Sequence, residues 1–300
     1  MLDKCELCAH KCKVNRINGQ IGRCRSTDKI KIALHSLHKF EEPCISGKNG
    51  SGTIFFSHCN LSCIYCQNYE ISQLDKGYEV TIEELADIFL EQQENNAENI
   101  NLVTPTMYVY QLIEAIKIAR NRGLKIPIIY NTNSYETVET IRLLDGYIDV
   151  YLPDLKYYSD DIALKYSKVK NYFDTATNAI KEMYKQVGTP KFDDDGIIQK
   201  GLLIRHLVLP GHIENSKRIL KWIKENMDNN IYISVMAQYF PTHLAKEDKY
   251  INRKLNKKEY NIIENYLYSL DLENGYIQEL GEHEEEYVPN FNCQKNVNMV

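Results

Sequence analysis

Short apolar runs alternate with amphipathic stretches along most of this 300-residue chain, and this alternation limits the folds that it can adopt. Six of the runs are rich in Ile, Val, Leu and Tyr and mostly lack regular polar alternation, which is typical of strands buried on both faces of a parallel sheet. They cover residues 52–57, 99–104, 126–131, 148–153, 202–209 and 231–236.

Helical patterns separate these runs. Between the first two, Thr81 and Glu84 form a capping-box sequence, and Ile82, Leu85 and Phe89 fall on one helical face. Further helices are expected after Tyr108, near Glu136, across 159–187 and after Asn215. Six β-α units in series predict an α/β fold, a partial (β/α)6 barrel of the TIM type, whose chemistry would gather at the C-terminal ends of the strands.

Nine cysteines are present, and three of them, Cys59, Cys63 and Cys66, follow the first predicted strand. In a reducing cytosol, closely spaced cysteines are more often metal ligands than disulfide partners. A structural zinc site takes four protein ligands, whereas a [4Fe–4S] cluster held by three thiolates leaves one iron free for another ligand. The trio therefore predicts an open cluster, and a zinc site completed by His58 is the alternative.

Four more cysteines, Cys5, Cys8, Cys12 and Cys24, have the spacing of a second metal site. Four thiols favour a closed site, which would hold structural zinc or an auxiliary [4Fe–4S] cluster. His10 lies within this motif and could replace one thiolate.

A glycine-rich stretch over residues 45–53 separates the Cys-rich segment from the first strand. We expect an N-terminal Cys-rich module at 1–45, the partial barrel at 46–280 and a C-terminal tail at 281–300. Cys44 and Cys293 stand alone and are expected to be packing or exposed thiols.

Composition excludes some partners. The formal net charge of -5 provides no electrostatic footprint for nucleic acid. The N-terminus has no apolar leader, and no apolar run approaches the length of a membrane span. We therefore expect a cytoplasmic protein without a membrane partner.

The CxxxCxxC spacing, with Tyr65 before its last cysteine, resembles the signature of the radical S-adenosylmethionine (SAM) superfamily. The segments "EEPCISG", "NINLVTPT", "IIYNTNSYE", "YLPDLKYY" and "RHLVLPG" resemble the PflX group, which is akin to pyruvate formate-lyase activating enzymes. The resemblance implies a partial (β/α)6 barrel that binds a [4Fe–4S] cluster and SAM. It also implies reductive cleavage of SAM to a 5'-deoxyadenosyl radical, which abstracts hydrogen from a substrate.

The same resemblance suggests partners and site residues. A reductant such as flavodoxin or ferredoxin would supply the electron, and a glycyl radical protein is a candidate substrate. Asp154 and Lys156, in "PDLKYY", correspond to residues that contact SAM, although charges at strand ends can also be merely solvated. Arg205 corresponds to the family's fifth-strand arginine. Within an apolar strand it needs either a core carboxylate or a ligand.

One segment departs from the superfamily pattern. Where many members carry G-G-E to meet the SAM amino group, this chain has "VTPT", so the hydroxyls of Thr104 and Thr106, or backbone carbonyls, would replace the carboxylate. Polar residues also end the third and sixth strands, where they would contact SAM or substrate or act as turn formers. They are Asn131, Asn133, Gln238 and Tyr239.

A second function also fits these residues. An iron–sulfur or zinc protein for electron transfer or redox sensing would also carry two metal centres, but it would not need a SAM pocket.

Overall fold

The computed structural model describes residues 2–281 and 289–291, so most of the predicted C-terminal tail, including Cys293, lies outside the described residues. The strands are β1 (Ile30–His38), β2 (Ser51–Phe56), β3 (Tyr78–Val80), β4 (Ile100–Val103), β5 (Ile128–Thr132), β6 (Val150–Pro153), β7 (Lys191–Phe192), β8 (Ile198–Leu207), β9 (Tyr232–Met236) and β10 (Gly275–Ile277). All six predicted runs coincide with strands.

The strands form one sheet in the order β10-β9-β8-β6-β5-β4-β2-β1-β3, and β7 pairs with β8 outside this path. Neighbours from β2 through β10 along the path are parallel, while β1 is antiparallel to both β2 and β3. The path has two ends that do not pair with each other among the described residues, as an open barrel requires. The predicted α/β fold with a parallel sheet is confirmed.

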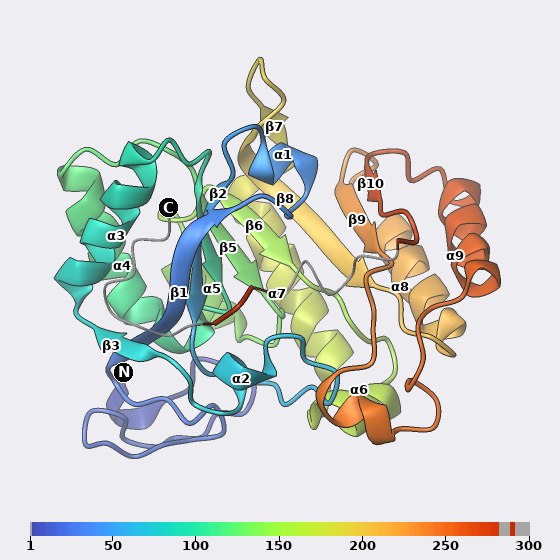
Figure 1. Cartoon of the computed structure of the whole chain (residues 1–300), viewed down its shortest axis with the longest axis horizontal. Coiled ribbons are helices and arrows are strands. Elements are labelled where there is room, and N and C mark those ends of the chain that lie inside the picture. The colour runs from blue at the N-terminus through green and yellow to red at the C-terminus, as the bar shows by residue number, and fades with distance from the viewer. Residues whose placement is uncertain (1, 282–288, 292–300) are drawn as a thin grey trace.

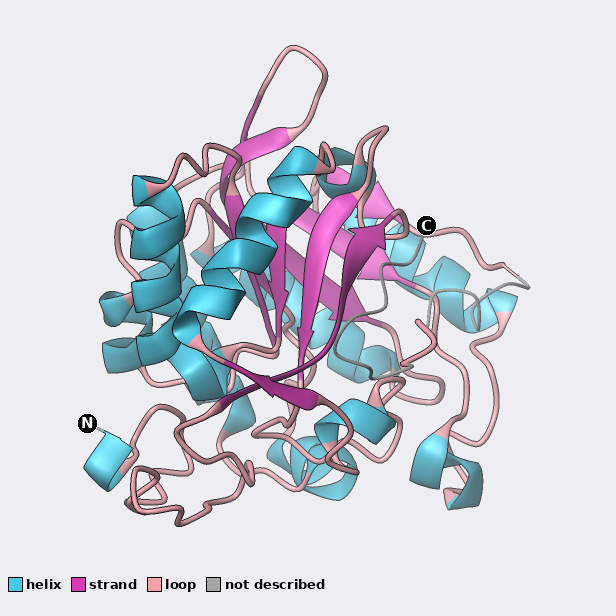
Figure 2. Ribbon diagram, turned by 60° about the vertical axis from the view of Figure 1, so that its left-hand side comes forward, coloured by secondary structure: helices cyan, strands magenta, loops and turns pink. Residues whose placement is uncertain are grey.

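Helices connect the parallel strands and cover the outer face of the sheet (Figure 2). The longer helices are α3 (Ile82–Glu94), α4 (Val109–Asn121), α5 (Val138–Leu143), α6 (Asp160–Ser167), α7 (Tyr172–Val187), α8 (Ile213–Asn226) and α9 (Lys257–Ser269). The short ones are α1 (Pro43–Ser46), α2 (Tyr69–Ser72), η1 (Leu2–Lys4), η2 (Thr106–Tyr108) and η3 (His243–Glu247). The predicted capping box of Thr81 and Glu84 begins α3, with both reciprocal hydrogen bonds present.

Both faces of the parallel strands are apolar because both are covered: the outer face by the helices, and the inner face by a cluster that includes α1. Side chains alternate between the faces of a strand, so Tyr130, Tyr151 and Leu202 join the main core under the helices. Their neighbours on the inner face form a second cluster with Cys44 and Ile45 of α1. The members of that cluster from the sheet are Ile129, Val150, Leu152, Ile198 and Leu203.

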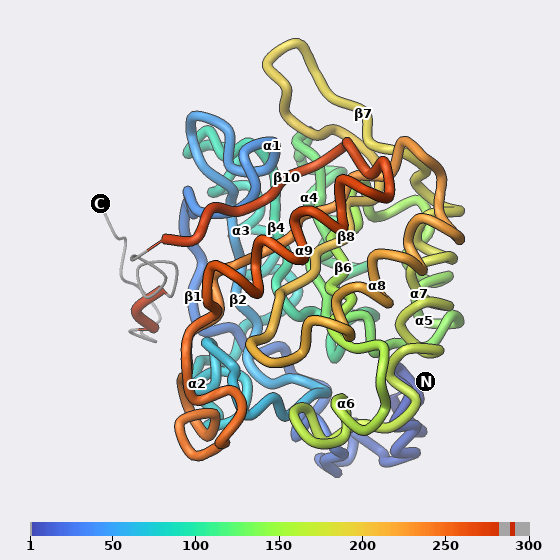
Figure 3. The backbone as a smooth tube through the Cα atoms, turned by 90° about the vertical axis from the view of Figure 1, so that its right-hand side faces the viewer, coloured from blue at the N-terminus to red at the C-terminus, as the bar shows by residue number. Residues whose placement is uncertain are grey.

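The N-terminal loops, residues 5–29, lie at the same end of the molecule as α2 and α6 (Figures 1 and 3). This is the end at which the parallel strands finish, because β2 leads directly into the loop before α2. Within the predicted module 1–45, β1 leaves these loops and joins the sheet beside β2. The Cys-rich segment is thus fixed against the edge where a barrel enzyme places its chemistry.

Candidate active site

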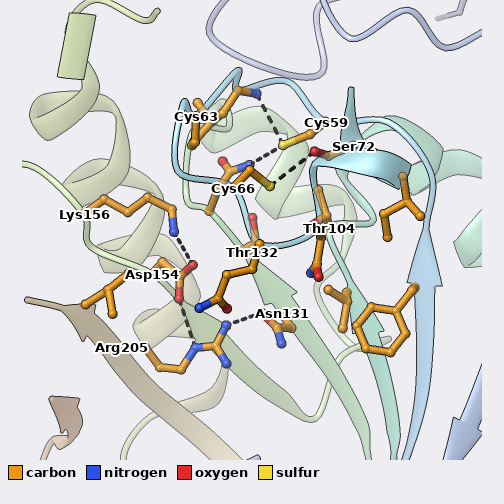
Figure 4. Close-up of a pocket in the computed structure, with 18 of the residues that line it drawn as sticks. Cys59, Cys63, Cys66, Ser72, Thr104, Asn131, Thr132, Asp154, Lys156 and Arg205 are labelled. Carbon is orange, nitrogen blue, oxygen red and sulfur yellow. Dashed lines mark hydrogen bonds and ion pairs between the residues drawn. The ribbon is translucent and has the colours of Figure 1, made fainter. Parts of the chain in front are cut away.

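Strand periodicity brings three predicted site residues to one place. Asn131, Asp154 and Arg205 each lie two positions after an inner-face apolar residue, respectively Ile129, Leu152 and Leu203. A step of two returns a strand residue to the same face, so these polar side chains continue the inner face at its C-terminal edge. There they line one cavity with the three cysteines (Figure 4).

The loop after β2 carries the three thiols, and each has a hydrogen-bond partner. The Cys59 Sγ accepts from the Nδ2 of Asn133 at 3.4 Å and from the backbone N–H of Leu61, also at 3.4 Å. The Cys63 Sγ lies 2.9 Å from the Ser167 Oγ, and the Cys66 Sγ lies 3.3 Å from the Ser72 Oγ. Hydrogen bonds to the sulfurs are a means by which proteins tune iron–sulfur clusters.

Burial raises the pKa of all three thiols. For Cys63 the pKa reaches about 11, although the nearby Lys156 ammonium opposes the rise. The pKa values of Cys59 and Cys66 are also raised by burial. The free thiols would therefore be protonated at neutral pH, and a bound metal would have to displace those protons.

The donor set fits a cluster because three thiols converge on one cavity, each with a polar neighbour. Within residues 2–281 and 289–291, no three His, Cys, Asp or Glu side chains form a group that could hold a single metal ion. His58, the alternative fourth ligand of a zinc site, has its ring nitrogens bonded elsewhere. Its Nε2 lies 2.6 Å from the Asp75 Oδ1, and its Nδ1 lies 3.1 Å from the Ser26 Oγ.

A network of buried charges forms the opposite wall of the cavity. Asp154 accepts from the Lys156 Nζ at 2.7 Å and from the Arg205 Nε at 2.9 Å. Arg205 also donates to the Glu41 Oε2 at 3.1 Å and to the Asn131 Oδ1 at 2.7 Å. The four charged side chains are only 11–17% exposed. The ion pairs thus lie in a setting where solvent screens them weakly.

Burial alone would favour neutral forms of these groups, but their mutual attraction outweighs it. The pKa of Asp154 is lowered because Lys156 and Arg205 overcome the effect of burial. The pKa of Lys156 is raised because Asp154 does the same in the opposite sense. The pKa of Arg205 is likewise raised because Asp154 outweighs the effect of burial. Asp154, Lys156 and Arg205 are therefore all charged at neutral pH.

The two threonines of "VTPT" lie in different environments. Thr104 lines the cavity and has a φ of 57°, a left-handed conformation that is unusual for a β-branched residue. Thr106 instead donates its hydroxyl to the Glu136 Oε1 at 2.6 Å. Glu136 also accepts from Tyr130 at 2.5 Å and from Thr132 at 3.1 Å, so hydroxyl groups satisfy this buried carboxyl.

The other predicted polar residues lie around the same cavity. Asn133 lines it and joins the Asn60 side chain at 2.7 Å as well as the Cys59 sulfur. Gln238 lines it and accepts from the Gln278 amide at 3.2 Å. Tyr239 is buried in its wall and donates to the Ile251 carbonyl at 2.6 Å.

Sequence reasoning missed several side chains that complete the site. Glu41 pairs with Arg205 across 164 positions of sequence, and Ser167 reaches Cys63 across 104. Ser167 also meets the Tyr157 hydroxyl at 2.6 Å, which in turn lies 2.5 Å from the Tyr65 hydroxyl. The adjacent acidic pair in "EEPCISG" was the one signal that could have drawn attention to Glu41.

The four N-terminal cysteines together line a small cavity of their own. Burial, reinforced by the neighbouring thiols, raises the pKa of Cys8 to about 12. His10 lies beside this cavity without lining it, and its Nε2 is 2.9 Å from the carbonyl oxygen of Asn60.

A buried arginine stands beside these thiols. Arg16 is 1% exposed, and its guanidinium donates to the carbonyls of Thr27 (3.0 Å) and Met107 (2.7 Å). Its Nη1 also points to the Cys5 Sγ at 3.9 Å. Within the described residues Arg16 makes no ion pair with a carboxylate.

Comparison with known proteins identifies the class. Residues 53–223 match the Radical SAM superfamily. The chain therefore belongs to the radical SAM superfamily, whose members use a [4Fe–4S] cluster and SAM in radical chemistry.

Two relatives in sequence are informative. An uncharacterized protein of Methanocaldococcus jannaschii, MJ0674, is 35% identical over 270 residues, which are 85% of this chain and 71% of that protein. The pyruvate formate-lyase-activating enzyme of Clostridium pasteurianum is 23% identical over 234 residues, 76% of this chain and 90% of that enzyme.

Solved structures share the fold. HydG of Carboxydothermus hydrogenoformans, an FeFe-hydrogenase maturase, is 16% identical with a TM-score of 0.53, over 77% of this chain and 54% of HydG. Methylornithine synthase (PylB) is 14% identical with a TM-score of 0.50, over 73% of this chain and 68% of PylB. The chain thus spans about half the length of HydG.

None of the described helices is long and apolar enough to cross a bilayer.

Proposed function

We propose that this chain is an enzyme that cleaves SAM reductively, with Cys59, Cys63 and Cys66 as the ligands of its [4Fe–4S] cluster. The observation that carries the proposal is the single cavity lined by three thiols on one side and by charged side chains on the other. A cluster bound there would supply the electron that splits the sulfonium of SAM.

The charged wall would hold the SAM molecule. Lys156 and Asp154 offer a cation and an anion 2.7 Å apart, which suits the carboxylate and ammonium of a zwitterionic amino acid. Arg205 orients Asp154, and Asn131, Asn133, Thr104 and Gln238 add polar contacts at the strand ends. We assign Thr106 a supporting role, because its hydroxyl is already committed to Glu136.

Apolar residues would keep water away from the reacting atoms. Phe55, Val103 and Leu207 line the cavity between the polar groups. Excluding water strengthens the electrostatic contacts inside a site and prevents side reactions of a reactive intermediate.

We further propose that Cys5, Cys8, Cys12 and Cys24, which line one small cavity, draw together around a second metal centre, either zinc or an auxiliary [4Fe–4S] cluster. Among the described residues these thiols do not already form a group that could hold a single metal ion. Arg16 supports this proposal because a buried cation requires a compensating negative charge. A metal bound by four thiolates carries net negative charge. The Arg16 guanidinium points to one of these four sulfurs, that of Cys5.

The relationship to the pyruvate formate-lyase-activating enzyme supports a specific proposal for the substrate. We propose hydrogen abstraction from a glycine of a partner protein, with flavodoxin or ferredoxin as the electron donor.

Reduced thiols in both clusters of cysteines suit a cytoplasmic enzyme.

The rival is an electron-transfer or redox-sensing protein, and one experiment separates the two. The protein is reconstituted anaerobically with iron and sulfide, reduced, and incubated with SAM. We expect 5'-deoxyadenosine to form and the EPR spectrum of the cluster to change on SAM addition. A Cys66→Ala variant should form none, whereas Cys44→Ala, which changes a buried thiol in α1, should resemble the wild type. A cluster signal that ignores SAM would support the electron carrier instead.

A further inference from the structure

A second cavity adjoins the proposed SAM pocket. Its volume is about 350 Å³, which is within the usual range for small-molecule sites. Residues 39–43 form one side, and three adjacent strands form the other. Arg205, Ser234 and Tyr276 lie side by side across β8, β9 and β10 in that wall. The two cavities share Phe40, Glu41, Arg205, Met236 and Gln238, so a molecule in the second cavity would lie next to SAM.

Glu42 is the unusual residue of this cavity. It is 8% exposed, and its Oε2 has no hydrogen-bond partner among the described residues. Although Glu42 directly precedes α1, its side chain does not cap that helix. Burial raises the pKa of the carboxyl and Glu41 adds to this rise, whereas Arg205, the Glu42 backbone and the Ser234 hydroxyl oppose it. Ser234 thus interacts with the carboxyl group, but the Oε2 is left without a partner.

Arg205 does not satisfy Glu42 directly. Its three nitrogens donate to Asp154, Glu41 and Asn131, and no ion pair joins it to Glu42. An unpartnered carboxylate oxygen in such a place costs folding free energy, because it loses its water without gaining a bond. Such a group is expected where a ligand supplies the missing partner.

The charges around both cavities indicate the kind of ligand. Three buried or nearly buried carboxylates, Glu41, Glu42 and Asp154, face two such cations, Arg205 and Lys156. Lys39 also lines the second cavity, but it is exposed to solvent. The interior therefore carries one more negative than positive group once Glu42 is ionised, a form that burial disfavours and that a bound cation would stabilise.

We propose that this cavity is the substrate site of the radical chemistry and that Glu42 binds a positively charged nitrogen of the substrate. The inference rests on the proposed function, since it takes the neighbouring cavity to be the SAM pocket. A charge-assisted hydrogen bond to the Glu42 Oε2 would supply the partner that the oxygen lacks. The class of substrate is then a molecule or side chain with an ammonium or guanidinium group. For the partner protein proposed above, this group would be a lysine or arginine side chain near the reacting glycine.

The test uses the reconstituted holoenzyme with SAM and two matched probes, n-butylammonium and neutral n-butanol, followed by calorimetric titration at pH 7. We expect the wild type to bind the cation and to bind the alcohol at least tenfold more weakly. Glu42→Gln keeps the shape but removes the charge, and it should weaken cation binding at least tenfold. Glu273→Gln makes the same change at an exposed position and should bind as the wild type.

Equal binding of both probes, or equal cation binding by Glu42→Gln and wild type, overturns the inference. Urea unfolding of Glu42→Gln gives a second readout. A reserved binding group predicts unchanged or greater stability, because a buried charge without a partner is removed. A clear loss of stability would make Glu42 a structural residue and overturn the proposal.

The same preparations separate this inference from the proposed function. Wild type that forms 5'-deoxyadenosine while Glu42→Gln binds the cation normally defeats this inference alone. Wild type that binds the cation through Glu42 but never cleaves SAM defeats the proposed function and leaves a cation site in place.

Discussion

At the scale of single residues, Arg205 connects three separate parts of the site. Its guanidinium joins β8 to Asp154 after β6, to Asn131 at the end of β5 and to Glu41 in the segment before α1. Each contact uses a different nitrogen. A planar group with several fixed donors suits this task, whereas an ammonium acts as a point charge on a flexible stem.

We therefore predict that Arg205→Lys is a damaging substitution despite its conserved charge. Loss of two or three buried contacts should lower the free energy of unfolding by about 3 kcal/mol and weaken SAM binding roughly tenfold or more. Urea unfolding and the SAM-dependent EPR change measure the two effects. Arg142→Lys, at a 60% exposed side chain with one 3.5 Å contact to Glu182, is the control. A variant that matches the wild type in both measurements would contradict the assigned role.

The sequence predicted some of these residues for a physical reason. Asn131 and Asp154 come at the ends of buried apolar runs, Arg205 interrupts one near its end, and parallel strands bring their C-terminal ends to one edge. Glu41 and Ser167 were missed because their contacts depend on chain paths far from any motif. No local pattern shows that the segment before α1 crosses the inner face, or that the end of α6 reaches Cys63.

At the scale of elements, the six longer parallel strands were predictable, whereas the antiparallel strands β1 and β3 and the short parallel strand β10 were not. Residues buried on both faces give continuous apolar runs, and the sequence contains six of them. β1 was missed because residues 30–38 contain two histidines, a lysine and a serine among their apolar residues, and one face of the strand is only partly buried. β3 and β10 have three residues each, too few for a periodic signal.

The turn after β4 carries a strained residue that offers a second prediction. Thr104 has a φ of 57°, and its backbone N–H donates to the Asn131 carbonyl at 2.9 Å. A left-handed conformation costs a non-glycine residue about 1–2 kcal/mol, and glycine avoids this cost. Glycine also has greater conformational freedom in the unfolded chain, which offsets part of that gain in stability. Thr104→Gly should therefore raise the free energy of unfolding by about 0.5 to 1 kcal/mol.

The same substitution tests whether the hydroxyl contacts SAM. Thr104→Gly should weaken SAM binding, whereas Thr104→Ser keeps the hydroxyl and should bind as the wild type. Unfolding in urea and SAM titration by EPR give both quantities. Lower stability of the glycine variant would show that the turn is not strained, and unchanged affinity would remove the Thr104 hydroxyl from the SAM contacts.

At the scale of the whole molecule, the N-terminal loops and the cysteine loop after β2 support each other. The His10 Nε2 lies 2.9 Å from the Asn60 carbonyl, and Arg23 donates to the Ser62 hydroxyl at 3.2 Å. Asn60 in turn accepts from Asn133, which also donates to the Cys59 sulfur. A change in the N-terminal loops can therefore reach the proposed cluster through three successive hydrogen bonds, from His10 to Asn60, from Asn60 to Asn133 and from Asn133 to Cys59.

The last prediction follows from this arrangement and from the proposed second metal centre. Replacing Cys5, Cys8, Cys12 and Cys24 by serine should remove that metal while Cys59, Cys63 and Cys66 still bind a cluster. Because a metal that binds only the folded chain contributes to folding, the variant should unfold at lower urea concentration. The loosened loops should also lower the yield of 5'-deoxyadenosine, because Asn60 loses its support.

Metal analysis, urea unfolding and product yield are compared with Cys44→Ser. Iron and zinc contents equal to those of the wild type would rule out a metal at these four cysteines, and a normal yield would show that the loops are not coupled to the active site.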